Sequence, residues 1–197
     1  MRVWRIAAAC AALIAAAPAL AHEDNSVSGG FVAGLLHPLA GADHLLAMVA
    51  VGLWGAYLGR PLIYVLPVVF PTVMAVGGIL GMAGLGALPV ELGIAASVLL
   101  LGTLVAASKS LPVWAACLIV GLFGLFHGFA HGQELPVSAD PVGYSAGFML
   151  STGSLHLAGI ALGLLTGHSG PLRNLPRILG AGIAVAGLWF LYRAATG

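Results

Sequence analysis

The chain has 197 residues, of which 60% are hydrophobic and only 7% are charged, and its formal net charge is +1. Soluble domains carry about 25% charged residues, so this composition predicts an integral membrane protein. A net charge close to zero offers no basic surface for nucleic acid. Seven histidines stand out in so apolar a chain, and histidine commonly serves as a proton relay or metal ligand.

The first 21 residues resemble a secretory signal peptide. A basic start, "MRVWR", precedes the short apolar run "IAAACAALIAAA", and the cleavage sequence "ALA" ends at Ala21. We therefore expect a signal peptide at residues 1–21 and a mature chain that begins at His22. Because the rest lacks the alternation of outer-membrane strands, the expected location is a bacterial inner membrane.

Residues 22–197 predict one all-α domain of six transmembrane helices. About 20 apolar residues cross a bilayer as a helix, which satisfies its own backbone hydrogen bonds in lipid. Loops rich in Gly and Pro separate the runs. The predicted spans are Phe31–Leu58, Leu62–Leu85, Val90–Ala107, Pro112–His131, Gly143–Thr166 and Leu175–Ala194.

Basic residues in the predicted loops give an orientation. Arg60, Lys109, Arg173 and Arg177 lie in alternate loops, which the positive-inside rule assigns to the cytoplasm. The mature N-terminus is then periplasmic, as cleavage of a signal peptide also requires.

The outer half of the first span contains the polar sequence "HPLAGADH". His37 and His44 are seven residues apart and would share one face of a continuous helix. Pro38 makes this turn irregular, so "HPLAG" is a candidate break in the helix. Asp43 would cap a helix that starts near Ala40, orient a histidine, or bind metal if the helix is distorted.

The fourth span ends in "FHGFAHGQE", at the same predicted face of the membrane. His127 and His131 are four residues apart, and this spacing lets two imidazoles share a metal ion. Glu134 joins that face if the helix continues through Gly132. The alternative is a polar cap at the interface, with histidines bonded to backbone carbonyls.

Two further residues are candidates for an ion pathway. Glu91 follows Pro89 at a helix start, where an acid also stabilises the first turn. His156 lies deep in the fifth span, after Ser151, Thr152 and Ser154. It would line a polar path or make a hydrogen bond between helices.

The sequences "HPLAGADHLLAM" (37–48) and "FHGFAHGQE" (126–134) resemble the two signature motifs of the HupE/UreJ proteins. "LHLAG" around His156 is similar to the family's fifth span. The family consists of small bacterial membrane proteins, often encoded beside hydrogenase or urease genes and regarded as nickel or cobalt permeases. The resemblance implies a metal site of His37, Asp43, His44, His127, His131 and Glu134, and a role in supplying hydrogenase or urease maturation.

We therefore expect a permease that moves Ni²⁺, or Co²⁺, from periplasm to cytoplasm. The ion would bind transiently, and no prosthetic group is expected. One alternative is an intramembrane zinc hydrolase in which three histidines hold Zn²⁺ and an acid activates water. Another is a haem protein with axial histidines on facing spans.

Overall fold

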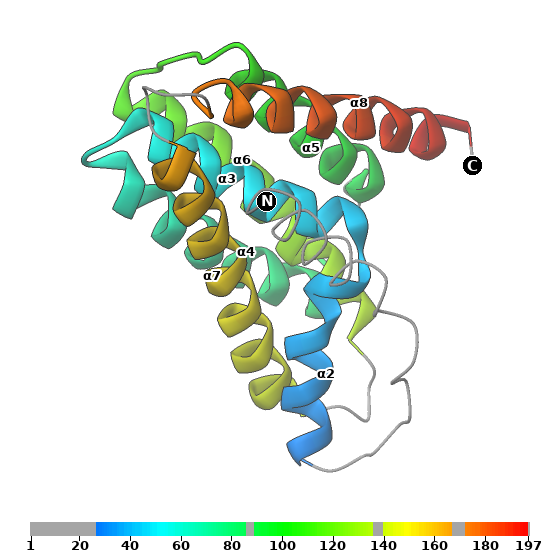
Figure 1. Cartoon of the computed structure of the whole chain (residues 1–197). Helices are drawn as coiled ribbons and strands as arrows, with labels where there is room; N and C mark the ends of the chain where they lie inside the picture. The colour runs from blue at the N-terminus through cyan, green and yellow to red at the C-terminus, as the bar shows by residue number, and fades with distance from the viewer. Residues whose placement is uncertain (1–26, 86–88, 136–139, 167–171, 197) are drawn as a thin grey trace, which may run out of the picture.

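The computed structural model describes residues 27–85, 89–135, 140–166 and 172–196, and these residues form helices with no strand among them (Figure 1). The predicted signal peptide lies outside the described residues. The helices are α2 (Val27–Ala40), α3 (Ala42–Leu58), α4 (Leu62–Met82), α5 (Val90–Ala106), α6 (Val113–Glu134), α7 (Pro141–Thr166) and α8 (Leu175–Thr196).

Four of the described helices, α4, α6, α7 and α8, are long and apolar enough to cross a membrane. The bent pair α2 and α3 adds a fifth candidate if the two halves form one broken span. The apolar helix α5 has 17 residues, which extend about 25 Å at 1.5 Å per residue. Large apolar side chains such as Trp114, Val142 and Leu165 are exposed on the outside, as expected of helices that face lipid. The chain is a polytopic α-helical membrane protein.

The first predicted span, Phe31–Leu58, is two helices that meet at an angle of 81°. The break falls at Gly41, the last residue of "HPLAG", which has an extended backbone (φ −95°, ψ 113°). Pro38, inside α2, removes one helical hydrogen bond just before it. The expectation that His37 and His44 share one helical face is therefore wrong: they belong to different helices.

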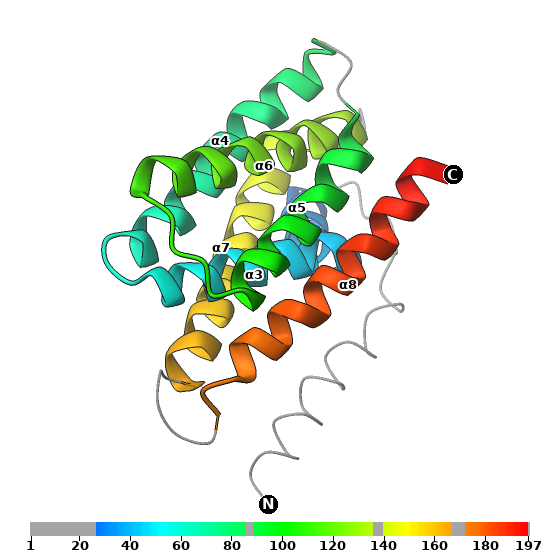
Figure 2. The same ribbon diagram turned by 90° about the horizontal axis from the view of Figure 1, so that it is seen from above.

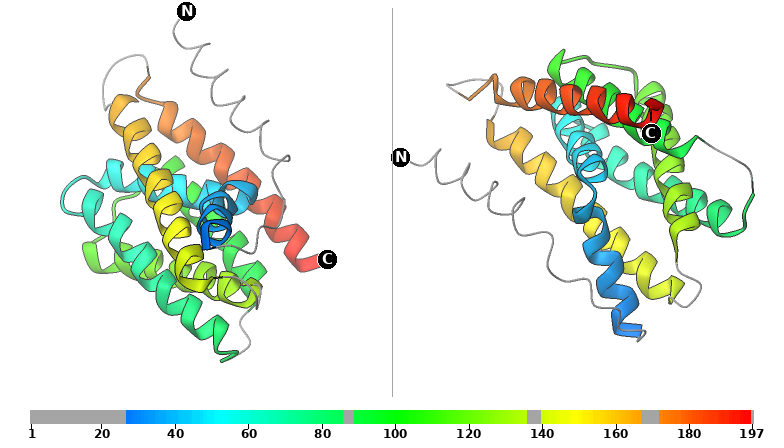
Figure 3. Two further views of the ribbon diagram at one scale, coloured as in Figure 1. Left: turned by 90° about the horizontal axis from the view of Figure 1, so that it is seen from below. Right: turned by 90° about the vertical axis from the view of Figure 1, so that its right-hand side faces the viewer.

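Helix α3 lies at the centre of the bundle. Consecutive residues around its middle, including Val51, Leu53 and Trp54, are almost completely buried, so it is covered on every side. Helices α5 and α7 pack against it, and α8 packs along α5 (Figure 2). Helix α2 turns away from α3 and runs beside the start of α7 (Figure 3).

Helices α4 and α6 approach so closely that their contact requires glycine. A Cβ atom at Gly77 or Gly81 would overlap the backbone of α6, and one at Gly128 or Gly132 would overlap the backbone of α4. Small residues at such positions are typical of helix contacts in membranes. Because both α6 glycines directly follow histidines in the sequence, this contact fixes the position of the helix face that carries His127 and His131.

Candidate metal site

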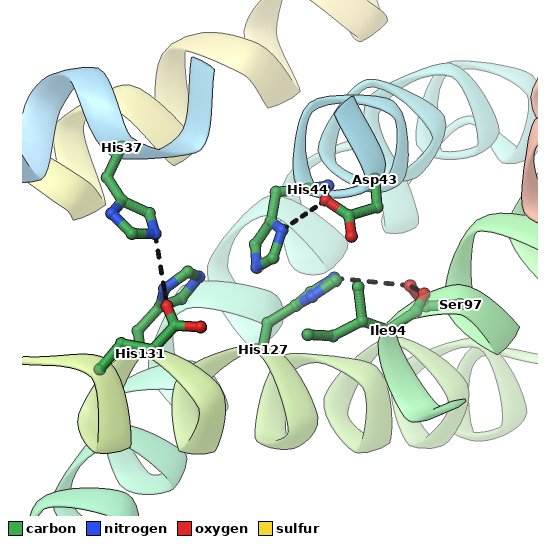
Figure 4. Close-up of polar contacts among 8 residues, drawn as sticks. His37, Asp43, His44, Ile94, Ser97, His127 and His131 are labelled. Atoms are coloured by element: carbon green, nitrogen blue, oxygen red, sulfur yellow. Dashed lines mark hydrogen bonds and ion pairs between the residues drawn. The ribbon is translucent and has the colours of Figure 1, made fainter. Parts of the chain in front are cut away.

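Four histidines from three helices meet at the bend between α2 and α3 (Figure 4). We call His37, His44, His127 and His131 the histidine cluster. The ring centroid of His131 lies 4.5 Å from that of His44 and 4.7 Å from that of His37. His44 and His127 are 4.8 Å apart, whereas His37 and His44 are 6.4 Å apart. Two motifs about ninety residues apart in the sequence thus come into ring contact.

The last turns of α6 supply half of the cluster. His127 and His131 lie on one helix face because the helix continues through Gly132 to Glu134, as the second motif requires. Glu134 Oε2 lies 3.6 Å from His131 Nδ1 and 3.6 Å from His37 Nε2. One carboxylate therefore stands between imidazoles of α2 and α6.

Asp43 orients His44 from the adjacent position. Its Oδ1 accepts hydrogen bonds from the backbone N–H of His44 and from the ring Nδ1, each at 2.8 Å. Gly41 lacks a side chain that would crowd these two residues, since a Cβ there would lie 3.0 Å from Asp43 Oδ1. A carboxylate that holds Nδ1–H leaves Nε2 with a free lone pair, which is how second carboxylates prepare histidine ligands. Asp43 thus lies in the first turn of α3, where an acid suits the helix dipole, while Gly41 occupies the N-cap position without a side-chain cap.

Several ring nitrogens of the cluster are buried without a hydrogen-bond partner. These atoms are His44 Nε2, His127 Nδ1, and both Nδ1 and Nε2 of His131. Buried polar atoms are normally hydrogen-bonded, because leaving one unpaired costs about 1–3 kcal/mol. A divalent cation bound among the rings would satisfy these lone pairs.

The donor atoms also meet the spacing that a metal ion needs. His37, His131 and Glu134 each place one ligand atom within 4.8 Å of the other two. The ring of His44 lies beside this group, 4.5 Å from that of His131 between centroids. Imidazole and carboxylate ligands suit divalent ions such as Ni²⁺, Co²⁺ and Zn²⁺. The arrangement can therefore strip water from such an ion and hold it between helices.

The surroundings of the cluster include residues that no sequence motif indicated. From α7, Phe148 packs on His131 at 4.2 Å and Tyr144 packs on His37 at 5.8 Å, both measured between ring centroids. From α5, Ser97 places its Oγ 3.4 Å from His127 Nε2 (Figure 4). In the sequence, only the four-residue spacing of Tyr144 and Phe148 indicated that these two rings share a helix face. No comparable pattern in the sequence indicated that Ser97 lies near a histidine.

A cavity of about 210 Å³ opens beside His131, between α4, α6 and α7. Tyr144 and Phe148 line it, together with three methionines, Met74, Met82 and Met149. The cavity brings space large enough for water to the edge of the cluster, next to a ring whose nitrogens make no hydrogen bond of normal length.

The two remaining candidates lie apart from the cluster. Glu91 is exposed in the first turn of α5, directly after Pro89, and no contact among the described residues joins it to the histidines. His156 is fully buried in α7. Its ring packs edge-on against Phe70 of α4, at 5.3 Å between centroids, and Phe70 also contacts His127 at 5.4 Å.

Fold and site together define a polytopic membrane protein with a buried histidine cluster between its helices. The family model described as "HupE / UreJ protein" matches residues 10–190, so the chain belongs to the HupE/UreJ family. The chain is also 42% identical to Protein HupE of Rhizobium leguminosarum bv. viciae, over 95% of this chain and 97% of the relative. No solved structure matches it.

Proposed function

We propose that the protein is a permease that moves Ni²⁺, or Co²⁺, across the bacterial inner membrane from periplasm to cytoplasm. The observation that carries the proposal is the histidine cluster: four imidazoles from three helices are in ring contact, and several of their nitrogens are buried without partners. Family membership supports the same conclusion, because HupE/UreJ proteins are regarded as nickel or cobalt permeases.

The donor set favours a borderline divalent ion. Imidazole nitrogens with one or two carboxylates bind Ni²⁺, Co²⁺ and Zn²⁺, and affinity generally rises from Co²⁺ to Ni²⁺. We assign His37, His44, His127, His131 and Glu134 as the ligands, and Asp43 as the residue that orients His44. The ion is cargo and binds transiently, so the protein needs no prosthetic group.

The proposed topology has six spans, with α2 and α3 as one broken span and α5 as the shortest. Broken helices are tolerated at membrane depth where they line a site, as "HPLAG" does here. With Lys109 and Arg60 in the cytoplasm, the mature N-terminus and the cluster face the periplasm. A cleaved signal peptide at residues 1–21 agrees with this orientation.

The proposed route runs from the cluster inward along α7 to His156, and the imported ion would supply hydrogenase or urease maturation. Glu91 would collect ions at the periplasmic face, since it is exposed at the start of α5, whose Ser97 touches the cluster.

Uptake of ⁶³Ni²⁺ by cells that lack other nickel transporters tests the proposal. Cells with His44→Ala or His127→Ala should accumulate little more nickel than cells without the protein. Thr103→Ala is a matched control, because that hydroxyl is exposed and bonds only within α5. Wild-type accumulation in both histidine variants would refute the site.

The zinc hydrolase remains the second candidate, because Glu134 stands 3.6 Å from two imidazoles, where it would act as a base on a metal-bound water. A hydrolase would purify with one tightly held zinc, whereas a permease would lose its ion to mild chelation. For haem, the three ring pairs with centroids 4.5 to 4.8 Å apart are too close for a macrocycle to fit between them.

A further inference from the structure

His156 is a completely buried polar residue that does not belong to the histidine cluster. The residue is fully buried in α7, and both of its ring nitrogens lack a hydrogen bond of normal geometry. Helix α3 covers it closely, because a Cβ at Gly52 would overlap the His156 carbonyl. Buried imidazoles are normally hydrogen-bonded, and here the Pro67 carbonyl of α4 interacts with the ring without a hydrogen bond of normal geometry.

Thr152 lies one turn earlier on the same face of α7 and is also fully buried. Its Oγ1 has no hydrogen-bond partner. Threonines in helices usually bond back to the carbonyl four residues earlier. All the other threonines of the chain do so: Thr72, Thr103, Thr166 and Thr196. The hydroxyl of Thr152 thus differs from the others in making no hydrogen bond within its own helix.

Helix α4 contributes a third group. Pro71 has no N–H, so the carbonyl oxygen of Pro67, four residues earlier, lacks its helical hydrogen bond. This carbonyl interacts with the His156 ring. Phe70, between the two prolines, contacts both His156 and His127. The Phe70 ring therefore links His156 to the histidine cluster.

We infer that His156, Thr152 and the Pro67 carbonyl form a second, inner binding station for the divalent cation. The inference rests on the proposed function and deepens it by adding a step to the route. The inner station offers one imidazole nitrogen and two neutral oxygens, whereas the cluster offers four imidazoles and a carboxylate. Its affinity is therefore lower, and conduction requires sites that release the ion as well as bind it. An ion that passes Phe70 exchanges strong ligands for weak ones before it leaves.

Two measurements on the purified full-length protein test the inner station. The first is equilibrium binding of Ni²⁺ alone, and the second is the initial rate of ⁶³Ni²⁺ uptake into proteoliposomes. His156→Gln should lose the weaker of two bound ions and keep the affinity of the stronger one, while uptake falls about tenfold or more, as for other losses of metal ligands and their partners. Thr152→Val keeps the shape of the side chain and should change both measurements in the same direction. Thr152→Val also tests the inner station by itself if His156→Gln does not fold.

Ser154→Ala is the matched control, because its hydroxyl is exposed on α7 and bonds to the Leu150 carbonyl. It should behave as wild type. The inner station is refuted if His156→Gln and Thr152→Val bind as many ions as wild type, or if they lose an ion without slowing uptake. If wild-type protein moves no nickel, the permease proposal fails, and the number of bound ions alone still decides whether the station exists.

Discussion

Asp43 fixes the ring of the residue that follows it: its Oδ1 lies 2.8 Å from both the backbone nitrogen and the ring Nδ1 of His44. The first contact belongs to the start of α3, and the second selects the tautomer in which Nδ1 carries the proton. His44 Nε2 then carries a lone pair that points into the cluster and accepts no hydrogen bond. One carboxylate thus contacts both the backbone at the start of α3 and the ring of a proposed metal ligand.

Asp43→Asn should therefore weaken nickel binding with little change in fold. The amide oxygen of Asn can still accept from the backbone N–H and from Nδ1–H, but it carries no charge, so it orients the ring less firmly and makes the Nε2 lone pair less basic. Loss of such an orienting partner typically lowers metal affinity about 10–100-fold. Equilibrium binding of Ni²⁺ to the purified protein measures the change. Asp140→Asn is the control, because Asp140 also accepts backbone N–H groups, at the start of α7, and should bind nickel normally. Equal affinity in wild type and Asp43→Asn would exclude the orienting role.

His127→Leu should make the ion-free protein more stable while it damages binding. The buried Nδ1 of His127 has no partner, and removal of such a group recovers about 1–3 kcal/mol. Ser97 is not left unpaired, because its Oγ also bonds to the Ile94 carbonyl at 2.6 Å. Thermal unfolding in detergent, with and without Ni²⁺, measures both effects.

In that experiment nickel should stabilise wild type by about 2.7 kcal/mol at a hundred times its Kd. The shift should shrink strongly in His127→Leu and remain in Ile94→Leu, which changes the neighbouring apolar contact alone. The interpretation of the cluster as a strained metal site would be contradicted by one result: a His127→Leu variant that is less stable than wild type without nickel and is stabilised by nickel as much as wild type.

Nickel uptake should fall once the external pH is low enough to protonate the histidine cluster. Only neutral imidazole binds a metal, so protons compete with the ion. Several rings must be neutral together, which makes the decline steeper than one proton would give. Initial ⁶³Ni²⁺ uptake between pH 4 and 8, at fixed free nickel, measures the profile. Uptake that is flat over this range would mean that histidines do not bind the transported ion.

Gly128→Ala should destabilise the protein and impair the site through the backbone. The added Cβ would overlap the carbonyl oxygen of Met74 on α4, so the two helices must separate. Overpacking of this kind typically costs about 1–3 kcal/mol, and it would displace His127 and His131. Gly153→Ala on α7 is the control, because a Cβ there meets nothing within 4 Å. It should be neutral or slightly stabilising, because alanine favours helix. Thermal unfolding and Ni²⁺ binding test the pair, and similar behaviour of both variants would contradict the role of the α4–α6 contact.

Apolar runs and the Gly- and Pro-rich loops between them predicted most helix boundaries to within a few residues. The fourth span was expected at Pro112–His131 and is observed as α6, Val113–Glu134. Gly–Pro loops end helices locally, so such limits are visible in the sequence. The 81° turn at Gly41 was only partly visible: Pro38 and "HPLAG" suggested a break, but not its angle.

The sequence by itself determined the helical membrane class, the family, and the chemical character of two motifs, because composition and local spacing carry that information. Only the tertiary structure decided which residues meet. His37 reaches His131 because α2 turns away from α3 at Gly41 and packs on α7, and α6 presents its histidines because glycines let it approach α4. Phe70 and Ser97 contact His127 for the same reason, since long-range helix packing is a property of the whole bundle and no local pattern encodes it.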